Sequence, residues 1–187
     1  MKRALLLLAA VSCAHPNVPP KESASAPKEA ASAPNARASD APPGASKGAA
    51  AGITFESLRD LKGKPVPVAV PGKVVLVDFW ATWCEPCKTA LPVYAKVYGD
   101  LRARGFEVVA VNVDEDDADV TSFLSSRPLP FTVLRDPGGQ YAERMGVSLM
   151  PTSFLLGKDG AVASRHDGFD GETEALLRKQ VAELIAK

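Results

Sequence analysis

The sequence predicts an α/β domain with a mixed central sheet flanked by helices on both faces. Two runs of almost continuous apolar residues, at 73–80 and 106–113, are typical of strands covered on both sides. Segments with helical spacing of apolar residues lie between and after them. A glycine-rich turn at 157–160 joins two later strand-like segments as a hairpin. Strands that alternate with helices and close in a hairpin indicate a mixed sheet.

The pattern places each element along the chain. Strands are expected at 73–80, 106–113, 131–134, 153–156 and 161–166. A long helix is expected over 85–104, and Gly105 ends it because glycine adopts the left-handed conformation of a helix cap. Shorter helices are expected around 120–124 and at 140–145. A final helix over 172–186 carries apolar residues on one side: Leu176, Leu177, Val181, Leu184 and Ile185.

The first 51 residues have a different character. Residues 1–12 combine a positive start with a short leucine-rich run, which is typical of a secretory signal. That run is shorter than the roughly 20 apolar residues of a membrane-spanning helix. The segment ending in Cys13 resembles a bacterial lipobox, which predicts lipidation of Cys13; an ordinary cleaved signal peptide is the alternative. Residues 13–51, mostly Ala, Pro, Ser and Lys, are expected to form a disordered tether before a folded domain at 52–187.

Charge and cysteine content narrow the classes of function. The chain has 22 basic and 22 acidic residues, so no nucleic-acid partner is expected. It has three cysteines. With Cys13 assigned to the leader, two cysteines remain for an oxidising compartment.

Those two cysteines form the motif Cys84-Glu85-Pro86-Cys87 at the start of the predicted long helix. Free N–H groups and the helix dipole at that position stabilise a thiolate. Cys87 lies one turn along the same face, and Pro86 is tolerated because first-turn N–H groups have no intrahelical acceptor. The motif therefore favours a reversible disulfide.

Two other interpretations of the motif remain. A structural zinc site needs four ligands, and the chain offers only Cys13 and two histidines, His15 and His166, beyond the pair. A purely structural disulfide is possible, but closing so short a loop removes little entropy from the unfolded chain.

The wider segment 77–88, VDFWATWCEPCK, resembles the active-site segment of thioredoxins, and its CEPC core is similar to the TlpA/ResA-type thioredoxin-like proteins. Residues 150–156, MPTSFLL, resemble the cis-proline strand of that family. About 25 residues separate Val113 from the helix at Gln140, which matches the extra βα insertion of the TlpA/ResA type. The resemblance covers roughly 54–187 and implies a thioredoxin-like fold.

The resemblance implies a role for each matching residue. Cys84 would be the exposed nucleophile and Cys87 the buried resolving thiol. The Met150–Pro151 bond would be cis, with the Met150 backbone pairing with an extended substrate.

The residues beside the cysteines would belong to the substrate-binding surface. Trp83 would shield the disulfide and contact substrate, with Pro86 beside it. Glu85 would disfavour the thiolate through its charge, or would simply complement the helix dipole as an exposed acid.

Asp78 interrupts an apolar strand, where burial is costly and raises the pKa of a carboxyl group. The resemblance implies that it handles the proton of the resolving cysteine; an Asp turned to solvent is the alternative. In the family, a lysine on the next strand usually accompanies this acid; its position here falls near Ala110, so that lysine is expected to be absent. Many proteins of the family also have a glutamate three residues after the second Cys, where this chain has Ala90. The acidic run 114–119 and His166 are expected to be solvated surface.

Together these features predict a thiol–disulfide oxidoreductase that needs no metal or organic cofactor. The resemblance implies reduction of disulfides in exported proteins, including a cytochrome c maturation-type role. The partners would be protein dithiols or disulfides and a membrane-embedded electron donor, with a lipid anchor holding the protein on the periplasmic side of a bacterial membrane. The alternatives are a thiol oxidase or isomerase, a Sco-like copper-binding chaperone, a peroxiredoxin-like peroxidase and a redox-silent interaction module.

Overall fold

The structure is a computed structural model that describes residues 55–66 and 71–187. The predicted signal peptide at 1–12, the lipidation site Cys13 and the tether at 13–51 lie outside these residues. Within the described part, no helix combines the length and the apolar character that crossing a membrane requires.

Six strands form one sheet in the order β1-β4-β3-β2-β5-β6. Strands β2, β3 and β4 are parallel to one another, whereas β1, β5 and β6 run antiparallel to their neighbours. The predicted mixed sheet is therefore confirmed. The strands are β1 Arg59–Asp60, β2 Val74–Trp80, β3 Phe106–Asn112, β4 Thr132–Arg135, β5 Thr152–Leu156 and β6 Val162–Asp167.

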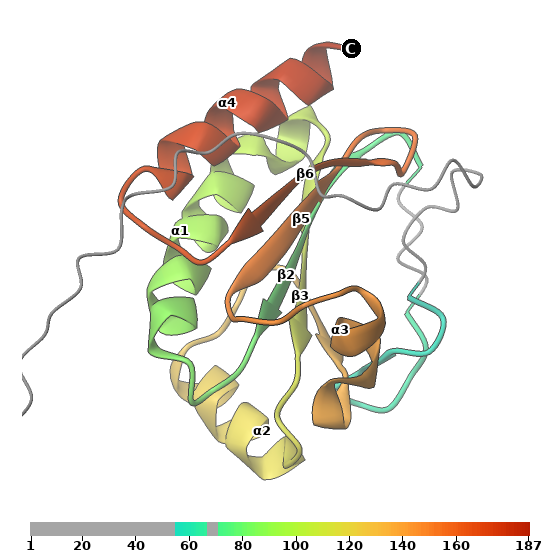
Figure 1. Ribbon diagram of the computed structural model, residues 1–187, viewed down its shortest axis with the longest axis vertical. Coiled ribbons are helices and arrows are strands. Elements are labelled where there is room, and N and C mark those ends of the chain that lie inside the picture. The colour runs from blue at the N-terminus through green and yellow to red at the C-terminus, as the bar shows by residue number, and fades with distance from the viewer. Residues whose placement is uncertain (1–54, 67–70) are drawn as a thin grey trace, which may run out of the picture. The chain divides into compact units, whose positions relative to one another are not determined.

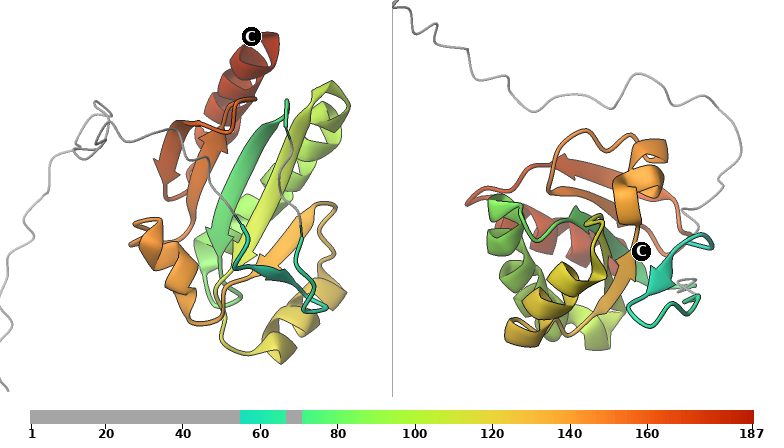
Figure 2. Two further views of the ribbon diagram at one scale, coloured as in Figure 1. Left: turned by 90° about the vertical axis from the view of Figure 1, so that its right-hand side faces the viewer. Right: turned by 90° about the horizontal axis from the view of Figure 1, so that it is seen from below.

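Helices cover both faces of this sheet, as predicted. Helices α1, α2 and α4 lie on one face, and the short helix α3 lies on the other (Figures 1 and 2). A left-handed Gly105, with φ 95°, ends the short 3₁₀ turn that follows α1. The helices are α1 Glu85–Leu101, α2 Asp117–Ser126, α3 Gln140–Arg144 and α4 Thr173–Ala186.

Strand β2 lies at the centre, and all seven of its residues are buried. Successive side chains of a strand point to opposite faces, so β2 contributes to two hydrophobic cores. Val74, Leu76 and Trp80 pack on the α1 side, whereas Val75, Val77 and Phe79 pack on the α3 side. By the same alternation, the side chain of Asp78 points toward α1.

The predicted insertion is present between β3 and α3. It consists of α2 followed by β4, and β4 adds to the sheet parallel to β3. Helix α2 begins earlier than predicted because the side chain of Asp116 caps its N-terminus. The two-residue strand β1 was not predicted, since it has no apolar pattern and is held by pairing with β4.

The register of the sheet brings three loops to one edge. In the parallel pair, Trp80 at the end of β2 lies beside Asn112 at the end of β3. In the antiparallel pair, Phe79 lies beside Thr152 at the start of β5. The loops that follow β2 and β3 therefore meet the loop that precedes β5, and the two cysteines lie at this meeting point.

Candidate active site

Cys84 and Cys87 form a disulfide with a sulfur–sulfur distance of 2.08 Å and a Cα–Cα distance of 5.3 Å. Cys84 is the N-cap of α1, and its Sγ accepts a hydrogen bond from the backbone N–H of Cys87 at 3.2 Å. The predicted pairing is local because the chain turns into a helix between the two cysteines. The helix N-terminus also favours negative charge on Cys84 once the bond is reduced.

The two sulfur-bearing residues differ in accessibility. Cys87 is completely buried, whereas Cys84 keeps 5% exposure. The expectation that Cys84 is exposed is therefore wrong for this disulfide form, because its sulfur is drawn onto the helix by its bond to Cys87. Cys84 is nevertheless the one of the pair that solvent reaches.

The residues around the disulfide form an exposed rim. Trp83 is 64% exposed immediately before Cys84. Glu85 lies in the first turn of α1, where it pairs with Lys88 at 2.6 Å, and the exposed Pro86 follows it. The positions of Trp83, Glu85 and Pro86 suit contact with a partner, and that role stays a prediction.

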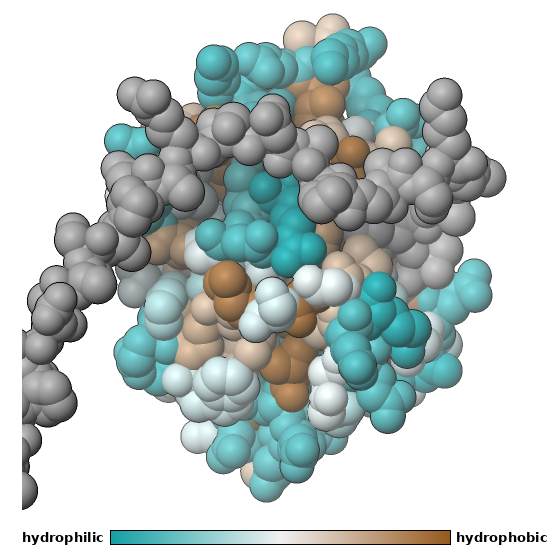
Figure 3. Space-filling view, viewed as in Figure 1, coloured by the Kyte–Doolittle hydropathy of each residue, from teal (hydrophilic) through white to brown (hydrophobic). Residues whose placement is uncertain are grey.

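The loop before β5 provides the other side of the site. The Met150–Pro151 peptide bond is cis. Leu149 is 47% exposed, and apolar residues gather over the loop between α3 and β5 (Figure 3). A shallow pocket of about 190 Å³ adjoins this loop and is lined by Val113, Gly139, Ala142, Glu143, Val147, Ser148, Leu149 and Met150.

Asp78 is fully buried, which excludes the solvent-facing alternative. Neither of its carboxylate oxygens has a hydrogen-bond partner among the described residues. Burial therefore raises the pKa of Asp78 well above its ordinary value. Ala110 lies beside Asp78 on β3, so the lysine of the family pattern is indeed absent from this position.

Tyr94 is a buried residue near Asp78 that the sequence interpretation missed. It lies on α1, two helical turns after Cys87, and is 1% exposed. Burial raises the pKa of Tyr94, the charge of Asp78 adds to the rise, and contact with the Ser153 hydroxyl opposes it. The seven-residue spacing from Cys87 was a usable signal, because it places Tyr94 on the same face of the helix.

His166 differs from its prediction as a surface residue. It lies on β6 beside Ser153 and is half-buried. Its Nε2 atom has no hydrogen-bond partner in the described part of the chain. Burial lowers the pKa of His166.

The prediction that the acidic run 114–119 lies at the surface is wrong for one of its residues. Asp114 was expected at the surface but is only 4% exposed. It accepts hydrogen bonds from both the backbone N–H and the hydroxyl of Thr82, each at 2.9 Å. A signal was available, because Asp114 follows β3 at the edge where the parallel strand β2 also ends. The remaining acids of the run, at 115–117 and 119, are exposed as expected.

A mixed sheet of this order, with a Cys-x-x-Cys disulfide at the N-terminus of α1 and a cis-proline loop opposite, defines a thioredoxin-fold disulfide protein. The chain belongs to the Redoxin family, whose model matches residues 28–181.

Individual proteins agree with this assignment. The chain is 38% identical over 110 residues to the thiol-disulfide oxidoreductase ResA of Bacillus thuringiensis subsp. konkukian, covering 58% of this chain and 64% of that protein. It is 33% identical over 129 residues to ResA of Halalkalibacterium halodurans, covering 68% of this chain and 72% of that protein. The match to the first relative thus spans less than two thirds of its length.

A solved structure shows the same fold. The putative thiol:disulfide interchange protein DsbE of Chlorobium tepidum superposes with a TM-score of 0.65 at 39% identity. The superposition covers 68% of this chain and 91% of that one. The predicted thioredoxin-like fold is confirmed.

Proposed function

We propose that this protein is a thiol–disulfide oxidoreductase that works through Cys84 and Cys87. The observation that carries the proposal is the disulfide at the N-terminus of α1, in which Cys84 alone keeps any exposure. The names of the related proteins support the same class of reaction.

The first step joins the protein to its substrate. In the dithiol form, the Cys84 thiolate attacks one sulfur of a substrate disulfide. A Cys84–substrate disulfide forms, the substrate's own disulfide breaks, and the leaving substrate sulfur takes a proton. Extended substrate backbone would lie along the loop that contains Met150 and Pro151, and Trp83 would pack against it.

The second step releases the substrate. Cys87 loses its proton and attacks the Sγ of Cys84, which re-forms the Cys84–Cys87 disulfide and expels the second substrate thiolate. Two electrons pass from the protein dithiol to the substrate disulfide. Asp78 lies on the sheet face toward α1, and in this proposal its carboxylate accepts the Cys87 proton, directly or through water. A raised pKa suits this role because it makes the carboxylate a stronger base.

The setting of the reaction is part of the proposal. The disulfides of exported proteins would be the substrates, and a membrane-embedded donor would return the protein to its dithiol form. Cys13 would carry the lipid anchor and residues 13–51 would form the tether, so that the domain works on the periplasmic side. A thiol oxidase would use the same residues in the opposite direction, and an isomerase would use them to break and re-form substrate disulfides with no net electron transfer.

The reduction potential of the Cys84–Cys87 pair tests both the proposed class of reaction and the direction of electron transfer. The full chain carrying Cys13→Ser would be equilibrated with glutathione and dithiothreitol buffers, with Cys84→Ser added as the control. A two-electron couple near or below about −250 mV supports a reductase, and one between about −120 and −180 mV supports an oxidase or isomerase. Absence of any reversible couple contradicts the proposed function.

Trapping separates the roles of the two cysteines. Cys87→Ser should accumulate a mixed disulfide with protein substrates, because the resolving thiol is missing. Cys84→Ser should accumulate none, since the remaining Cys87 is buried. Equal trapping by the two variants contradicts the assigned order of attack.

Labelling with a radioactive fatty acid tests the anchor. The wild-type chain should incorporate label and sediment with membranes, and Cys13→Ser should lose both properties. Label that persists in Cys13→Ser contradicts the predicted lipidation site.

A further inference from the structure

We propose that Asp114 is a positioning residue that holds the reactive loop, residues 81–84, through Thr82. The inference rests on the proposed function, because it concerns how the same disulfide is presented to substrate. Asp114 lies on the loop after β3, and Thr82 lies two residues before Cys84.

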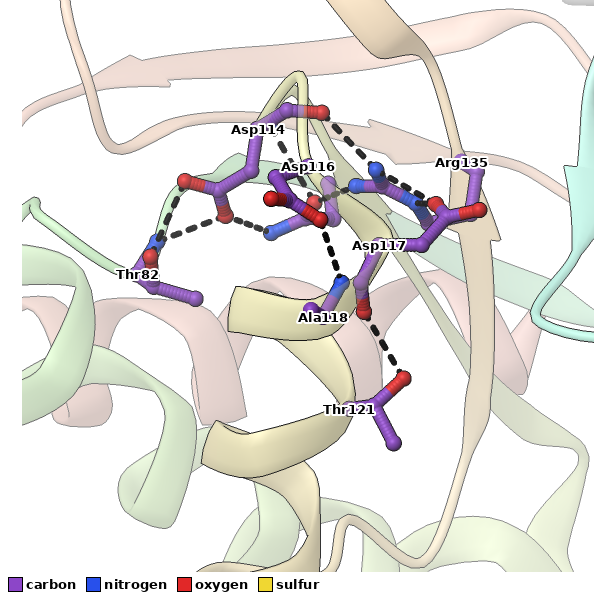
Figure 4. A network of polar contacts seen from close by, with 8 residues as sticks. Thr82, Asp114, Asp116, Asp117, Ala118, Thr121 and Arg135 are labelled. Carbon is purple, nitrogen blue, oxygen red and sulfur yellow. Dashed lines mark hydrogen bonds and ion pairs between the residues drawn. The ribbon is translucent and has the colours of Figure 1, made fainter.

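Asp114 holds Thr82 by both its main chain and its side chain. One carboxylate oxygen accepts the Thr82 backbone N–H and the other accepts the Thr82 hydroxyl, each at 2.9 Å (Figure 4). Two bonds from one carboxylate fix the orientation of Thr82 as well as its position. Asp114 is 4% exposed, so bulk water does not compete well for these bonds.

Asp114 is itself fixed by hydrogen bonds with Asn112 and Arg135. The Asn112 side-chain amide donates to it at 2.6 Å, and the Asp114 N–H donates to the Asn112 side-chain oxygen at 3.2 Å. Arg135 of the inserted strand β4 donates to that same Asn112 oxygen and, at 2.9 Å, to the backbone carbonyl of Asp114. The guanidinium also pairs with the exposed Asp117 at 2.7 Å.

This arrangement is built for geometry more than for charge pairing. Among the residues that the structure describes, the carboxylate of Asp114 accepts hydrogen bonds only from neutral donors, on Thr82 and Asn112. Arg135 is 5% exposed, yet its hydrogen bonds go to an amide oxygen, a carbonyl and Asp117. Burying charged groups is costly, and apolar packing generally stabilises a fold at least as well. A polar network beside the reactive loop is therefore best explained by the position it imposes.

The loop has few other constraints between β2 and α1. The Val113 N–H donates to the Trp80 carbonyl at 3.0 Å, and the Cys84 N–H donates to the Ala81 carbonyl at 3.2 Å. Trp83 lies between these bonds and is 64% exposed. Cys84 is also held by its disulfide and by the Cys87 N–H, so we expect Thr82 to act mainly on the direction in which Trp83 faces substrate.

Two substitutions at Asp114 distinguish position from charge. Asp114→Asn keeps a carbonyl oxygen for the Thr82 N–H, and its amide can donate to the Thr82 hydroxyl, so the geometry survives without the charge. Asp114→Ala removes every side-chain contact and keeps only the main-chain hydrogen bonds to Asn112 and Arg135. We expect kcat/KM for disulfide reduction within about twofold of wild type for Asp114→Asn, and a loss on the order of tenfold to a hundredfold for Asp114→Ala.

Backbone order parameters from nuclear magnetic resonance provide a readout that does not need activity. In Asp114→Ala the amides at 82–84 should become more mobile, whereas those in α4 should keep wild-type values. Asp116→Asn is the matched control: it removes one charge from the same loop, and asparagine still caps α2. It should leave both rate and order parameters unchanged.

Thr82 tests the same contact from the other side, with less risk to folding. Thr82→Ser keeps the hydroxyl and should resemble wild type, whereas Thr82→Val removes it and should show part of the Asp114→Ala effect. Equal losses in Asp114→Asn and Asp114→Ala would show that charge matters, and would overturn the proposal. Unchanged order parameters at 82–84 in Thr82→Val would overturn it as well. If the wild-type chain reduces no disulfide, the proposed function fails while the order parameters still decide the role of Asp114.

Discussion

Asp78→Asn is expected to stabilise the folded protein at neutral and alkaline pH. The Asp78 side chain is fully buried, and both carboxylate oxygens lack partners among the described residues. Asparagine has the same shape and comparable polarity but cannot ionise. The substitution therefore removes the cost of ionising Asp78 in the interior, or of keeping its proton at a pH where the unfolded chain would release it, and leaves packing unchanged.

The size of the effect follows from burial. An unpartnered buried polar group costs about 1–3 kcal/mol, and an uncompensated buried charge costs about 3–5 kcal/mol. Because the asparagine amide is itself unpartnered, only the difference is recovered. We expect the free energy of unfolding of the disulfide form to rise by about 2 kcal/mol at pH 8.

The sign of the pH dependence can be derived from the pKa. Burial raises the pKa of Asp78 in the folded state above its value in the unfolded chain, so the folded state binds its proton more tightly. The stability linked to that proton is fully present below the unfolded pKa and is lost as pH rises through the folded pKa. The advantage of Asp78→Asn should therefore be large at pH 8 and should vanish as pH approaches 4.

Urea unfolding at pH 4, 6 and 8, with the disulfide intact, measures this advantage. The control is Asp119→Asn, an exposed acid in the first turn of α2, which should change stability by less than about 0.5 kcal/mol. The same Asp78→Asn variant should resolve its mixed disulfide at least about tenfold more slowly at pH 7, because Cys87 loses its base. Equal stability at pH 8 would refute the buried-charge argument, and a normal rate of resolution would refute the proton-transfer role.

Further changes test the packing, the turn after α1 and the half-buried histidine. Leu177→Ala should lower the free energy of unfolding by about 2–5 kcal/mol, and Leu176→Ala, at an exposed position, by less than about 1 kcal/mol; similar losses would contradict the packing of α4. Gly105→Ala should cost about 1–2 kcal/mol because φ is 95°, whereas Gly171→Ala, with no left-handed φ, should cost less in the same urea assay. The ring of His166 should titrate below pH 6.5 in nuclear magnetic resonance spectra, since burial lowers its pKa; a midpoint at or above 6.5 would contradict this.

The major elements were predictable because their signals are local. Strand β2 is a continuous apolar run, and its predicted start differs from the observed one by one residue. Gly105 marks the end of the first helical segment, although α1 itself ends at Leu101 and a 3₁₀ turn occupies the last three predicted positions. Strand β1 was not predictable in the same way. It is a pair of charged residues, Arg59 and Asp60, and only its pairing with β4, far along the chain, makes it a strand.

The residues of the site also differ in whether local sequence or distant contacts determine their positions. The Cys84–Cys87 pair and the burial of Asp78 depend on their own segments, which the sequence displays directly. The roles of Asp114 and Tyr94 depend on contacts with other elements, and their positions in the sequence were only partial signals. The burial of Asp114 requires the loop after β3 to lie beside Thr82, and that proximity is set by the register of two parallel strands.

The order of the sheet also governs whether molecules can pair through their strands. Strands β1 and β6 are the two edges of the sheet. An edge strand exposes unpaired backbone N–H and C=O groups, which can form hydrogen bonds with a strand of another chain. One edge is only two residues long and charged. The other carries Arg165 and Asp167, which pair with each other at 2.9 Å, so a neighbouring chain would have to approach two charged side chains to extend the sheet. The charged residues at both edges therefore disfavour extension of the sheet by a second copy of this chain.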